Sequence, residues 1–416
     1  MKGLLIVAVR DLDPPAGGAE MSLATLLKGV SVPGLLETAN VDYVPCEGDP
    51  SIDDSESVEG WDVVIFQSDS RGDATDLTND SNLTRNTLSI PVEDLLSGAA
   101  WRLRDSSGNP NHLLYRSHLK RANKKFTRYI GEEIVALVEE AKKRGQPIVG
   151  VTQLHWSAGA AKVFEMAKVP YLAFVRDELQ SRNRDVYRSS LENAAVVCCA
   201  GEGLGLQVTE NFSIKSLANI RLPVDFGGRF GSIESVIGSR SKGMEGRKDP
   251  DVPRISVVGV TPEKGFAFYQ KLFPYLAKVW PEARVDIYGG GSYAEKLGGF
   301  ENVTWHGHTP VSDVFSVCDI HMLTVESTGS WGRVINEAGL FGVPTVTIGI
   351  GSQPEAVGQG GCVVPSSGSL NEWVSALKKC YDERLELGEL ARQHCSIVDH
   401  RRSIAAFRSV LEQFKV

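Results

Sequence analysis

Short apolar runs rich in β-branched residues recur along the chain, and each is followed by glycine or polar residues and then by a stretch with helical spacing. This alternation is typical of parallel strands connected by helices. The pattern predicts strands at 4–9, 63–66, 148–151, 171–175 and 195–199 in the first half, and at 255–258, 285–288, 320–324, 345–348 and 362–364 in the second. The predicted fold class is therefore α/β, with two sets of parallel strands.

The spacing of these runs divides the 416 residues into two halves. A chain of this length is longer than a domain with a single hydrophobic core usually is, and it suits two domains of roughly 200 residues each. Residues 227–250 are rich in Gly, Ser and charge and poor in apolar side chains, so we interpret them as a linker or mobile loop. The segments 47–59 and 69–111 are polar, and we expect irregular structure there.

The composition is that of a water-soluble protein, with 42% hydrophobic and 23% charged residues and no apolar run long enough for a membrane helix. The apolar start is followed at once by Arg10 and Asp11 without a cleavage site, which indicates a first strand rather than a signal peptide. Seven cysteines without a C-x-x-C pair favour reduced thiols and a cytoplasmic location. The net charge of -8 gives no overall attraction to nucleic acid or anionic membrane.

One basic stretch departs from this acidic average. It consists of Arg116, His118, Lys120, Arg121, Lys124, Lys125 and Arg128. A solvated helix face is one interpretation. The other interpretation is a docking surface for an anionic acceptor, such as a phospholipid head group, a polyphosphate or a nucleic acid. Under this interpretation, Lys120 and Arg121 are candidate acceptor-binding residues.

The most informative segment is 329–346, which reads GSWGRVINEAGLFGVPTV. A glycine-containing turn here leads into a helix, whose free amino-terminal amides and positive dipole end suit a diphosphate. Glu337 is a lone carboxylate in an otherwise apolar helix, placed to accept hydrogen bonds from ribose hydroxyls. A capped helix with one tolerated glutamate is the alternative.

Other turns also offer backbone amides to a ligand. Gly17 and Gly18 follow the first strand, and missing side chains there let amides approach a phosphate or an acceptor closely. In the second half, Lys264 stands in a turn after the strand 255–258, where it would meet phosphate as a point charge beside backbone amides. Arg176 and Asp177, at the end of the strand 171–175, are candidate cleft residues on topological grounds.

The segment 329–346 resembles the donor-site signature of the retaining GT-B glycosyltransferases of family 4, in which seven residues separate two glutamates. It is especially similar to the subgroup in which the turn reads ESWGRVVIEA. Glu337 matches the second glutamate, to which the resemblance assigns ribose binding. The first glutamate falls on Gly329, and Glu326 is the nearby carboxylate that could replace it toward the donor sugar.

Several further segments resemble the same family. The residues VVGVTPEKG at 257–265 are similar to the subgroup loop NPTPEKG, which implies that Lys264 neutralises the departing diphosphate beside Gly259, although the arginine of the usual motif is missing. YGGGSY at 288–293 resembles the GDGP turn, NVTWHGH at 302–308 resembles the segment lining the base pocket, and GSQPEAV at 351–357 matches the GGxPE turn. The donor-binding residues implied are Gly17, Gly18, Gly259, Lys264, Gly290, Trp305, His306, Ser330, Trp331, Gly332, Arg333 and Glu337.

In the first half, 17–20 resembles the GGAE turn of the family, and His155 stands where the family often carries a histidine near the reacting sugar. A structural histidine is the alternative for His155. The resemblance implies a GT-B architecture, in which two Rossmann-like domains face each other across a cleft. Residues 1–226 are then the acceptor domain, 251–395 the donor domain, and 396–416 a helix that crosses back to the first domain.

The function implied is that of a retaining, metal-independent glycosyltransferase, with His155, Lys264 and Glu326 as catalytic residues. The resemblance implies transfer of a hexosyl or pentosyl group from a UDP- or GDP-sugar without a cofactor, and no DxD-type metal motif is needed for this chemistry. The acceptor stays open among small molecules, lipid carriers, polysaccharides and modified nucleic acid, and a homodimer is a further option. Two alternatives use the same scaffold: a nucleotide-sugar epimerase, and a degenerate nucleotide-sugar sensor or scaffold subunit.

Overall fold

The computed structural model describes residues 2–10, 12, 18–31, 60–69, 87–91, 113–153, 156–176, 179, 184–224, 233–262, 264–325 and 331–415. The described chain forms two compact units. Unit 1 contains the residues up to Pro223 together with those from His400 onward, and unit 2 contains Val224–Asp399. The expected α/β class, with two Rossmann-like domains built on parallel strands, is confirmed.

Unit 1 is built on a parallel sheet in which the described strands follow the order β3-β2-β1-β4-β5-β6-β7. Its strands are β1 (Gly3–Arg10), β2 (Trp61–Asp69), β3 (Thr87–Pro91), β4 (Ile148–Gln153), β5 (Tyr171–Val175), β6 (Val196–Cys199) and β7 (Leu217–Asn219). The two central strands pair in register, with Leu4 opposite Ile148 and Ala8 opposite Thr152. Because β4 and β5 are buried along their whole length, they read as continuous apolar runs in the sequence.

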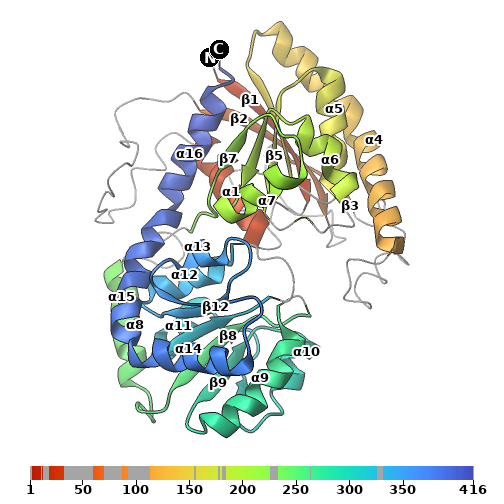
Figure 1. The fold of residues 1–416 in the computed structure, drawn as a ribbon. Coiled ribbons are helices and arrows are strands. Elements are labelled where there is room, and N and C mark those ends of the chain that lie inside the picture. Colours follow the sequence, from red (N-terminus) through yellow and green to blue (C-terminus); the bar gives the residue numbers. More distant parts are fainter. Residues whose placement is uncertain are drawn as a thin grey trace. The chain divides into compact units, whose positions relative to one another are not determined.

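The helices of unit 1 cover this sheet (Figure 1). They are α1 (Gly18–Ser31), α4 (Leu113–Lys143), α5 (Ala160–Ala167), α6 (Arg184–Glu192), α7 (Glu202–Asn211) and α16 (His400–Glu412), with a 3-10 turn η2 (Trp156–Gly159). The last helix, α16, packs with α1 on the core of unit 1, where Phe407 meets Phe174 edge-on at 5.7 Å between ring centroids. The helices approach closely because Gly29 has no side chain: a Cβ there would lie 2.3 Å from Ile404 Cδ1.

Unit 2 is built on a second parallel sheet with the described order β10-β9-β8-β11-β12-β13. Its strands are β8 (Arg254–Val258), β9 (Arg284–Tyr288), β10 (Val303–Trp305), β11 (Ile320–Leu323), β12 (Thr345–Ile348) and β13 (Gly361–Val364). Its helices are α8 (Ile233–Glu245), α9 (Phe266–Val279), α10 (Ser292–Leu297), α11 (Val311–Val317), α12 (Arg333–Leu340), α13 (Gln353–Val357), α14 (Leu370–Asp382) and α15 (Arg384–His394), followed by a 3-10 turn η4 (Cys395–Val398).

Helix α8 lies within the segment that the sequence predicts to be a linker, so that prediction is corrected for residues 233–245. The helix is anchored by polar contacts rather than by a broad apolar face. Arg240 donates from Nη1 to the Phe315 carbonyl at 2.9 Å, and Gly243 lies so close to Ser316 that a Cβ would meet its carbonyl oxygen at 2.4 Å. Contacts of this kind do not need apolar residues at helical spacing, so the sequence shows no pattern that predicts the helix.

Strand β3 corrects a second expectation, because Thr87–Pro91 lies inside the segment 69–111 predicted to be irregular. It pairs with β2 and stands at the outer edge of the described sheet. A five-residue edge strand carries little signal in the sequence. Among the described helices, none combines the length and the apolar character needed to cross a membrane.

Candidate functional site

The turn that follows β8 brings a lysine side chain onto a strand end. Gly259 ends the strand with φ of 73°, and its N–H donates to the Tyr288 carbonyl at 2.8 Å. The side chain of Lys264 folds back over this position, so that a Cβ on Gly259 would lie 3.4 Å from Lys264 Nζ. Lys264 is exposed, and no carboxylate pairs with it in the part of the chain that the structure describes. Its ammonium group is therefore available to a ligand phosphate at this edge of the sheet.

The amino terminus of α12 is formed by a second glycine turn. Gly332 has φ of 73°, and a Cβ there would lie 2.9 Å from Leu323 Cδ2. Just before it, the fully buried Trp331 donates from Nε1 to Asn336 Oδ1 at 2.6 Å, and Asn336 donates in turn to the Ala356 carbonyl at 3.1 Å. These contacts fix the first turn of α12, where the positive end of the helix dipole lies.

Both turns pack against the end of the same strand. Gly265, with φ of 76°, lies so close to Thr324 that a Cβ would meet its Cγ2 at 2.2 Å, while Gly332 contacts Leu323. Leu323 and Thr324 are consecutive residues at the carboxyl end of β11, which lies between β8 and β12 in the sheet. The Lys264 turn and the α12 amino terminus are thus brought together at the carboxyl edge, where α/β sheets bind their ligands.

An ion pair joins two of the predicted donor-binding residues on α12. Arg333 Nε lies 3.1 Å from Glu337 Oε1, and the exposed fractions of the two side chains are 12% and 8%. The spacing is one helical turn, so the two side chains lie on the same face of α12. Glu337 therefore has a fixed orientation and a charge-compensating partner, and the site holds two cationic groups, on Lys264 and Arg333.

A buried network supports the neighbouring strands. Asp286 on β9 is 1% exposed and accepts two hydrogen bonds from Arg254 on β8, at 2.9 and 3.0 Å. His306, just after β10, places its Nε2 atom 2.6 Å from Asp286 Oδ1 and stacks on Tyr288 with ring centroids 4.8 Å apart. The indole of Trp305 is 38% exposed and donates to the Gly289 carbonyl at 2.9 Å. Asp286 and Arg254 were not predicted as site residues; their one signal in the sequence is a charged residue inside an otherwise apolar strand.

His321 is a second residue that the sequence analysis missed. It lies on β11 with no exposed surface, and its Nδ1 atom is 3.2 Å from both the Oγ and the carbonyl oxygen of Ser256. Burial, together with the positive charge of Lys264, lowers the pKa of His321 to about 3, against the opposing effect of its hydrogen bond to the Ser256 carbonyl. The imidazole is therefore neutral and supports the strand beneath the Lys264 turn.

Several predicted residues lie outside the described part of the chain. These are Gly17, His155, Asp177, Glu326, Gly329 and Ser330. Gly18 opens α1, and Gly290 lies in the turn between β9 and α10. Arg176 follows β5 with 3% exposure, packs over the Phe174 ring at 4.5 Å and donates to the Ile220 carbonyl at 3.4 Å. Its guanidinium group thus contacts Phe174 on β5 and Ile220, which follows β7, and its role toward an acceptor remains a prediction.

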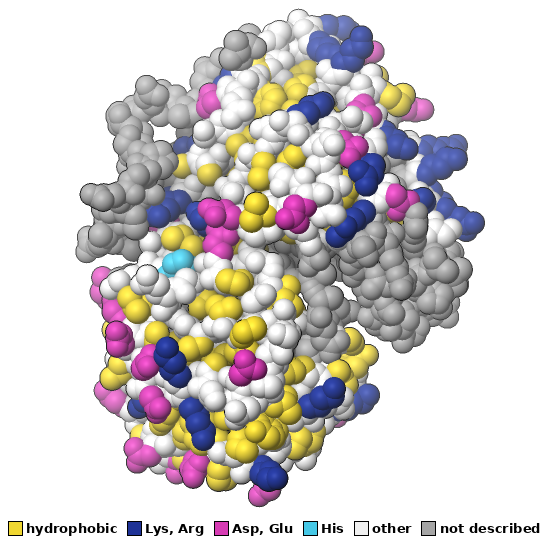
Figure 2. Space-filling view, in the orientation of Figure 1, with side chains coloured by type: hydrophobic (Ala, Val, Ile, Leu, Met, Phe, Trp, Pro, Cys, Tyr) yellow, Lys and Arg dark blue, Asp and Glu magenta, His cyan; other side chains and the backbone are white. Residues whose placement is uncertain are grey.

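The basic stretch forms an exposed face on the first half of α4. The described cations are Lys120, Arg121, Lys124, Lys125 and Arg128, and all are exposed. Lys120 pairs with Asp185 on α6 at 3.2 Å. Figure 2 shows Lys and Arg side chains gathered along the side of unit 1 where α4 lies. We refer to these five residues as the α4 basic face.

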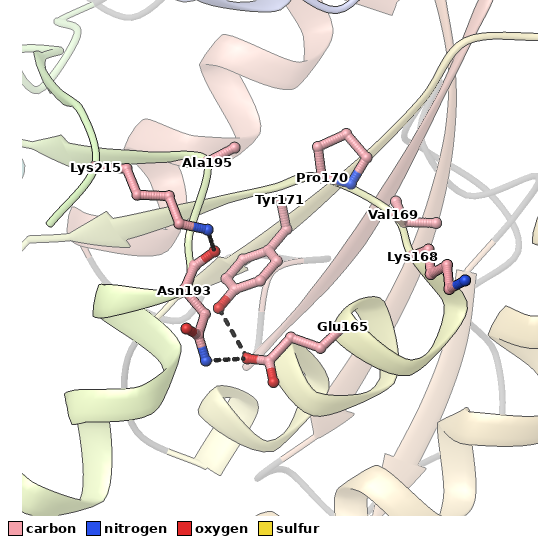
Figure 3. A pocket seen from close by; sticks show the side chains of 8 residues that line it. All are labelled: Glu165, Lys168, Val169, Pro170, Tyr171, Asn193, Ala195 and Lys215. Carbon is pink, nitrogen blue, oxygen red and sulfur yellow. Dashed lines mark hydrogen bonds between the residues drawn. The ribbon is translucent and has the colours of Figure 1, made fainter.

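A pocket of about 470 Å³ lies in unit 1, beside the residues that precede β5 and β6 (Figure 3). Val169 and Pro170 precede β5 and Asn193 precedes β6, so the pocket lies at the amino ends of these strands. Glu165 is held there by Tyr171 at 3.3 Å and Asn193 at 3.1 Å. The pocket belongs to unit 1, whereas Lys264 belongs to unit 2. Within the described residues, no group of three or more His, Cys, Asp or Glu side chains is placed to hold a metal ion.

Comparison with known protein families gives one match, which lies within unit 2. Residues 252–383, which include Lys264, Arg333 and Glu337, match the family model for glycosyl transferases group 1. No curated protein matches the chain.

Solved structures show the same fold over almost the whole chain. HepE of Anabaena in complex with UDP and glucose superposes with a TM-score of 0.62 at 14% identity, covering 99% of this chain and 100% of HepE. Sucrose-phosphate synthase of Thermosynechococcus elongatus superposes with a TM-score of 0.66 at 14% identity, covering 99% of both chains. The UDP-forming α,α-trehalose-phosphate synthase of Burkholderia vietnamiensis superposes with a TM-score of 0.67 at 12% identity, covering 99% of this chain and 100% of the synthase. At these identities the likeness shows the fold, which is the GT-B architecture of glycosyltransferases.

Proposed function

We propose that this protein is a retaining glycosyltransferase of family 4 type, which transfers a hexosyl or pentosyl group from a nucleotide sugar without a metal ion. One observation carries the proposal: the Lys264 turn and the α12 amino terminus meet at the end of β11. Both features lie within the residues that match glycosyl transferases group 1. Together they provide a point charge and a row of backbone amides for one diphosphate.

The nucleotide half of the donor is assigned to α12 and to the turns after β9 and β10. Glu337, held by Arg333, accepts hydrogen bonds from the ribose hydroxyls. Trp305 and His306 lie beside the base, with the position of His306 supported by Asp286. HepE was solved with UDP and glucose, which favours UDP over GDP as the nucleotide here.

The chemical step separates the sugar from the diphosphate. As the bond between the anomeric carbon and the diphosphate oxygen breaks, the electron pair stays on that oxygen and the negative charge of the leaving group grows. Lys264, Arg333 and the α12 amides stabilise this charge, and this is why we infer that no metal ion is required. The acceptor hydroxyl then attacks from the face that the leaving group vacates and gives its proton to the departing diphosphate oxygen, and this same-face attack retains the anomeric configuration. We assign the remaining roles near the sugar to His155 and Glu326.

The acceptor is assigned to unit 1. The α4 basic face presents five cations on one helix, and a surface of this kind favours an anionic acceptor. Lipid carriers with phosphate groups, phosphorylated small molecules, anionic polysaccharides and modified nucleic acid all have this property. We place the protein in the cytoplasm, in keeping with the free thiols of its described cysteines.

A donor panel tests the proposal. The protein is incubated with UDP- and GDP-sugars in the presence of a chelator, and released nucleoside diphosphate is measured over time. We expect slow hydrolysis of one cognate donor, undiminished by chelation, with the released sugar first appearing as the anomer present in the donor. Tight nucleotide binding without turnover of any donor would instead support the nucleotide-sugar sensor, and interconversion of the donor sugar would support an epimerase.

A further inference from the structure

A buried asparagine joins two helices of unit 2. Asn336 on α12 accepts a hydrogen bond from Trp331 Nε1 at 2.6 Å and donates from Nδ2 to the Ala356 carbonyl on α13 at 3.1 Å. The signature ESWGRVVIEA, which this segment resembles, has isoleucine at the same position. This chain therefore has a polar side chain, with both ends of its amide hydrogen-bonded, in place of an apolar one.

A buried glutamine joins α13 to the strand ends. Gln353, the first residue of α13, places its Oε1 atom 2.6 Å from the hydroxyl oxygen of Thr347 on β12. The same hydroxyl oxygen lies 3.0 Å from the carbonyl oxygen of Leu323, the last residue of β11. One hydroxyl group thus connects α13 to both β11 and β12.

The two sets of contacts close into a ring at the Gly332 turn. Gly332 follows Trp331 directly in the chain, and a Cβ on Gly332 would lie 2.9 Å from Leu323 Cδ2. From Gly332 the ring passes to Leu323 and, through Gln353, to α13. From α13 it returns through Asn336 to Trp331. The polar side chains of the ring are at most 1% exposed, and they belong to Trp331, Asn336, Thr347 and Gln353.

We propose that Asn336 and Gln353 are positioning residues, which hold the Gly332 turn and the amino terminus of α12 in place for the diphosphate of the donor. The inference rests on the proposed function, in which the α12 amides receive this diphosphate. Both residues act through the turn rather than by contact with the donor. Trp331 acts in the same way, since its side chain is fully buried and its indole N–H is bonded to Asn336.

Hydrogen bonds suit this task because they fix both distance and direction. The amides of a helix terminus stabilise a growing negative charge well only at about 2.7–3.1 Å from it, so a small shift of the turn weakens their effect. An apolar side chain in place of Asn336 would remove an acceptor from the Trp331 indole and a donor from the Ala356 carbonyl. Buried polar groups that lose a partner destabilise the arrangement that holds them, so the turn would move.

The first test observes the ring itself by nuclear magnetic resonance, in protein whose tryptophans carry a nitrogen isotope label. The indole signal of Trp331 is identified by its absence from Trp331→Phe. We expect Asn336→Ile to shift this signal upfield in the proton dimension and to speed exchange of the indole proton with solvent, because the hydrogen bond is lost. An unchanged Trp331 signal in Asn336→Ile would overturn the proposal.

The second test measures what the ring does for the ligand. Uridine lacks the diphosphate, so the ratio of UDP affinity to uridine affinity reports on the diphosphate site alone. We expect this ratio to fall about tenfold in Asn336→Ile and in Gln353→Leu, with uridine affinity as in the parent. Trp331→Phe, a milder change that also breaks the ring, should lower the ratio in the same direction.

The matched control is Trp373→Phe on α14, which alters a buried tryptophan in the core of the same unit. It should reduce stability and leave the ratio of the two affinities unchanged. A ratio equal to that of the parent in the folded ring variants would show a purely structural role and overturn the proposal.

Cleavage of UDP-sugars by the same proteins separates this inference from the proposed function. A parent that prefers UDP to uridine, and loses this preference in the ring variants, but cleaves no donor would contradict glycosyl transfer and leave the positioning roles in place. Donor cleavage with an unchanged ratio in the variants would contradict only the positioning roles. A parent without preference for UDP over uridine would contradict both.

Discussion

Arg333 Nε lies 3.1 Å from Glu337 Oε1, one helical turn further along α12. Both residues were predicted to contact the nucleotide donor, but their contact with each other is visible only in the structure. An ion pair of such low exposure is costly to break, because removal of one partner leaves the other charge buried and uncompensated. The pair therefore orients Glu337 and keeps Arg333 near the amino terminus of the helix.

Replacement of the carboxylate tests the assigned role of Glu337. We expect Glu337→Ala to remain folded and to bind UDP about tenfold or more weakly, because hydrogen bonds from the ribose to a charged acceptor are lost. Isothermal titration calorimetry gives the affinity, and circular dichroism checks the fold. Glu386→Ala on α15, which removes an exposed carboxylate from the same unit, is the control and should bind as the parent does. Unchanged UDP affinity in Glu337→Ala would remove this residue from the site.

The α4 basic face offers a test of the acceptor assignment. Replacing Lys120, Arg121, Lys124 and Lys125 with serine should raise the KM for an anionic acceptor and flatten its dependence on salt, while donor hydrolysis continues unchanged. Lys143→Ser with Arg144→Ser, at the other end of the same helix, is the matched control. Acceptor kinetics equal to those of the parent at both low and high salt would show that the face is only solvated surface.

The buried His321 makes the stability of unit 2 depend on pH. Its pKa is about 3 in the folded chain and 6.5 in the unfolded chain, so protons bind preferentially to the unfolded state below pH 6.5. Stability should therefore fall as the pH drops from 6.5 towards 3, by up to ~1.4 kcal/mol per pH unit from this residue. His321→Gln should reduce this slope in urea unfolding. Identical slopes in variant and parent would argue against a neutral, buried imidazole.

Gly265 tests the packing that positions Lys264. Alanine there must adopt a φ of 76° and place its Cβ 2.2 Å from Thr324 Cγ2. We expect Gly265→Ala to lower the free energy of unfolding by about 1–3 kcal/mol, and to reduce donor hydrolysis as the turn shifts. Gly238→Ala on α8 is the control, since its Cβ would meet nothing within 4 Å and should be neutral or stabilising. Equal stability of the two variants would contradict the described geometry of the turn.

The sequence predicted the sheets well because buried parallel strands leave continuous apolar runs. The prediction for 171–175 coincides with β5 and that for 345–348 with β12. It failed where stability comes from contacts without an apolar period, as in α8, which is anchored by Arg240 and by the close approach of Gly243. The edge strand β3 was hidden by its short length within a polar segment.

For the candidate site, the sequence indicated which residues stand at strand ends but not how they combine. The conformational need for glycine at 259, 265 and 332 follows from positive φ values that only the folded chain reveals. The partners of Glu337 and His306, which are Arg333 and Asp286, depend on three-dimensional contacts.

The most direct test of the central claim is a comparison of single-turnover donor cleavage with donor affinity in Lys264→Ala. Because the charge on the diphosphate grows as the glycosidic bond breaks, we expect the cleavage rate to fall by about 10²-fold or more while the dissociation constant of the donor changes much less. Lys271→Ala, which removes an exposed lysine from α9 in the same unit, should match the parent in both quantities. A cleavage rate in Lys264→Ala equal to that of the parent, with only the affinity reduced, would contradict the proposed role of this site in glycosyl transfer.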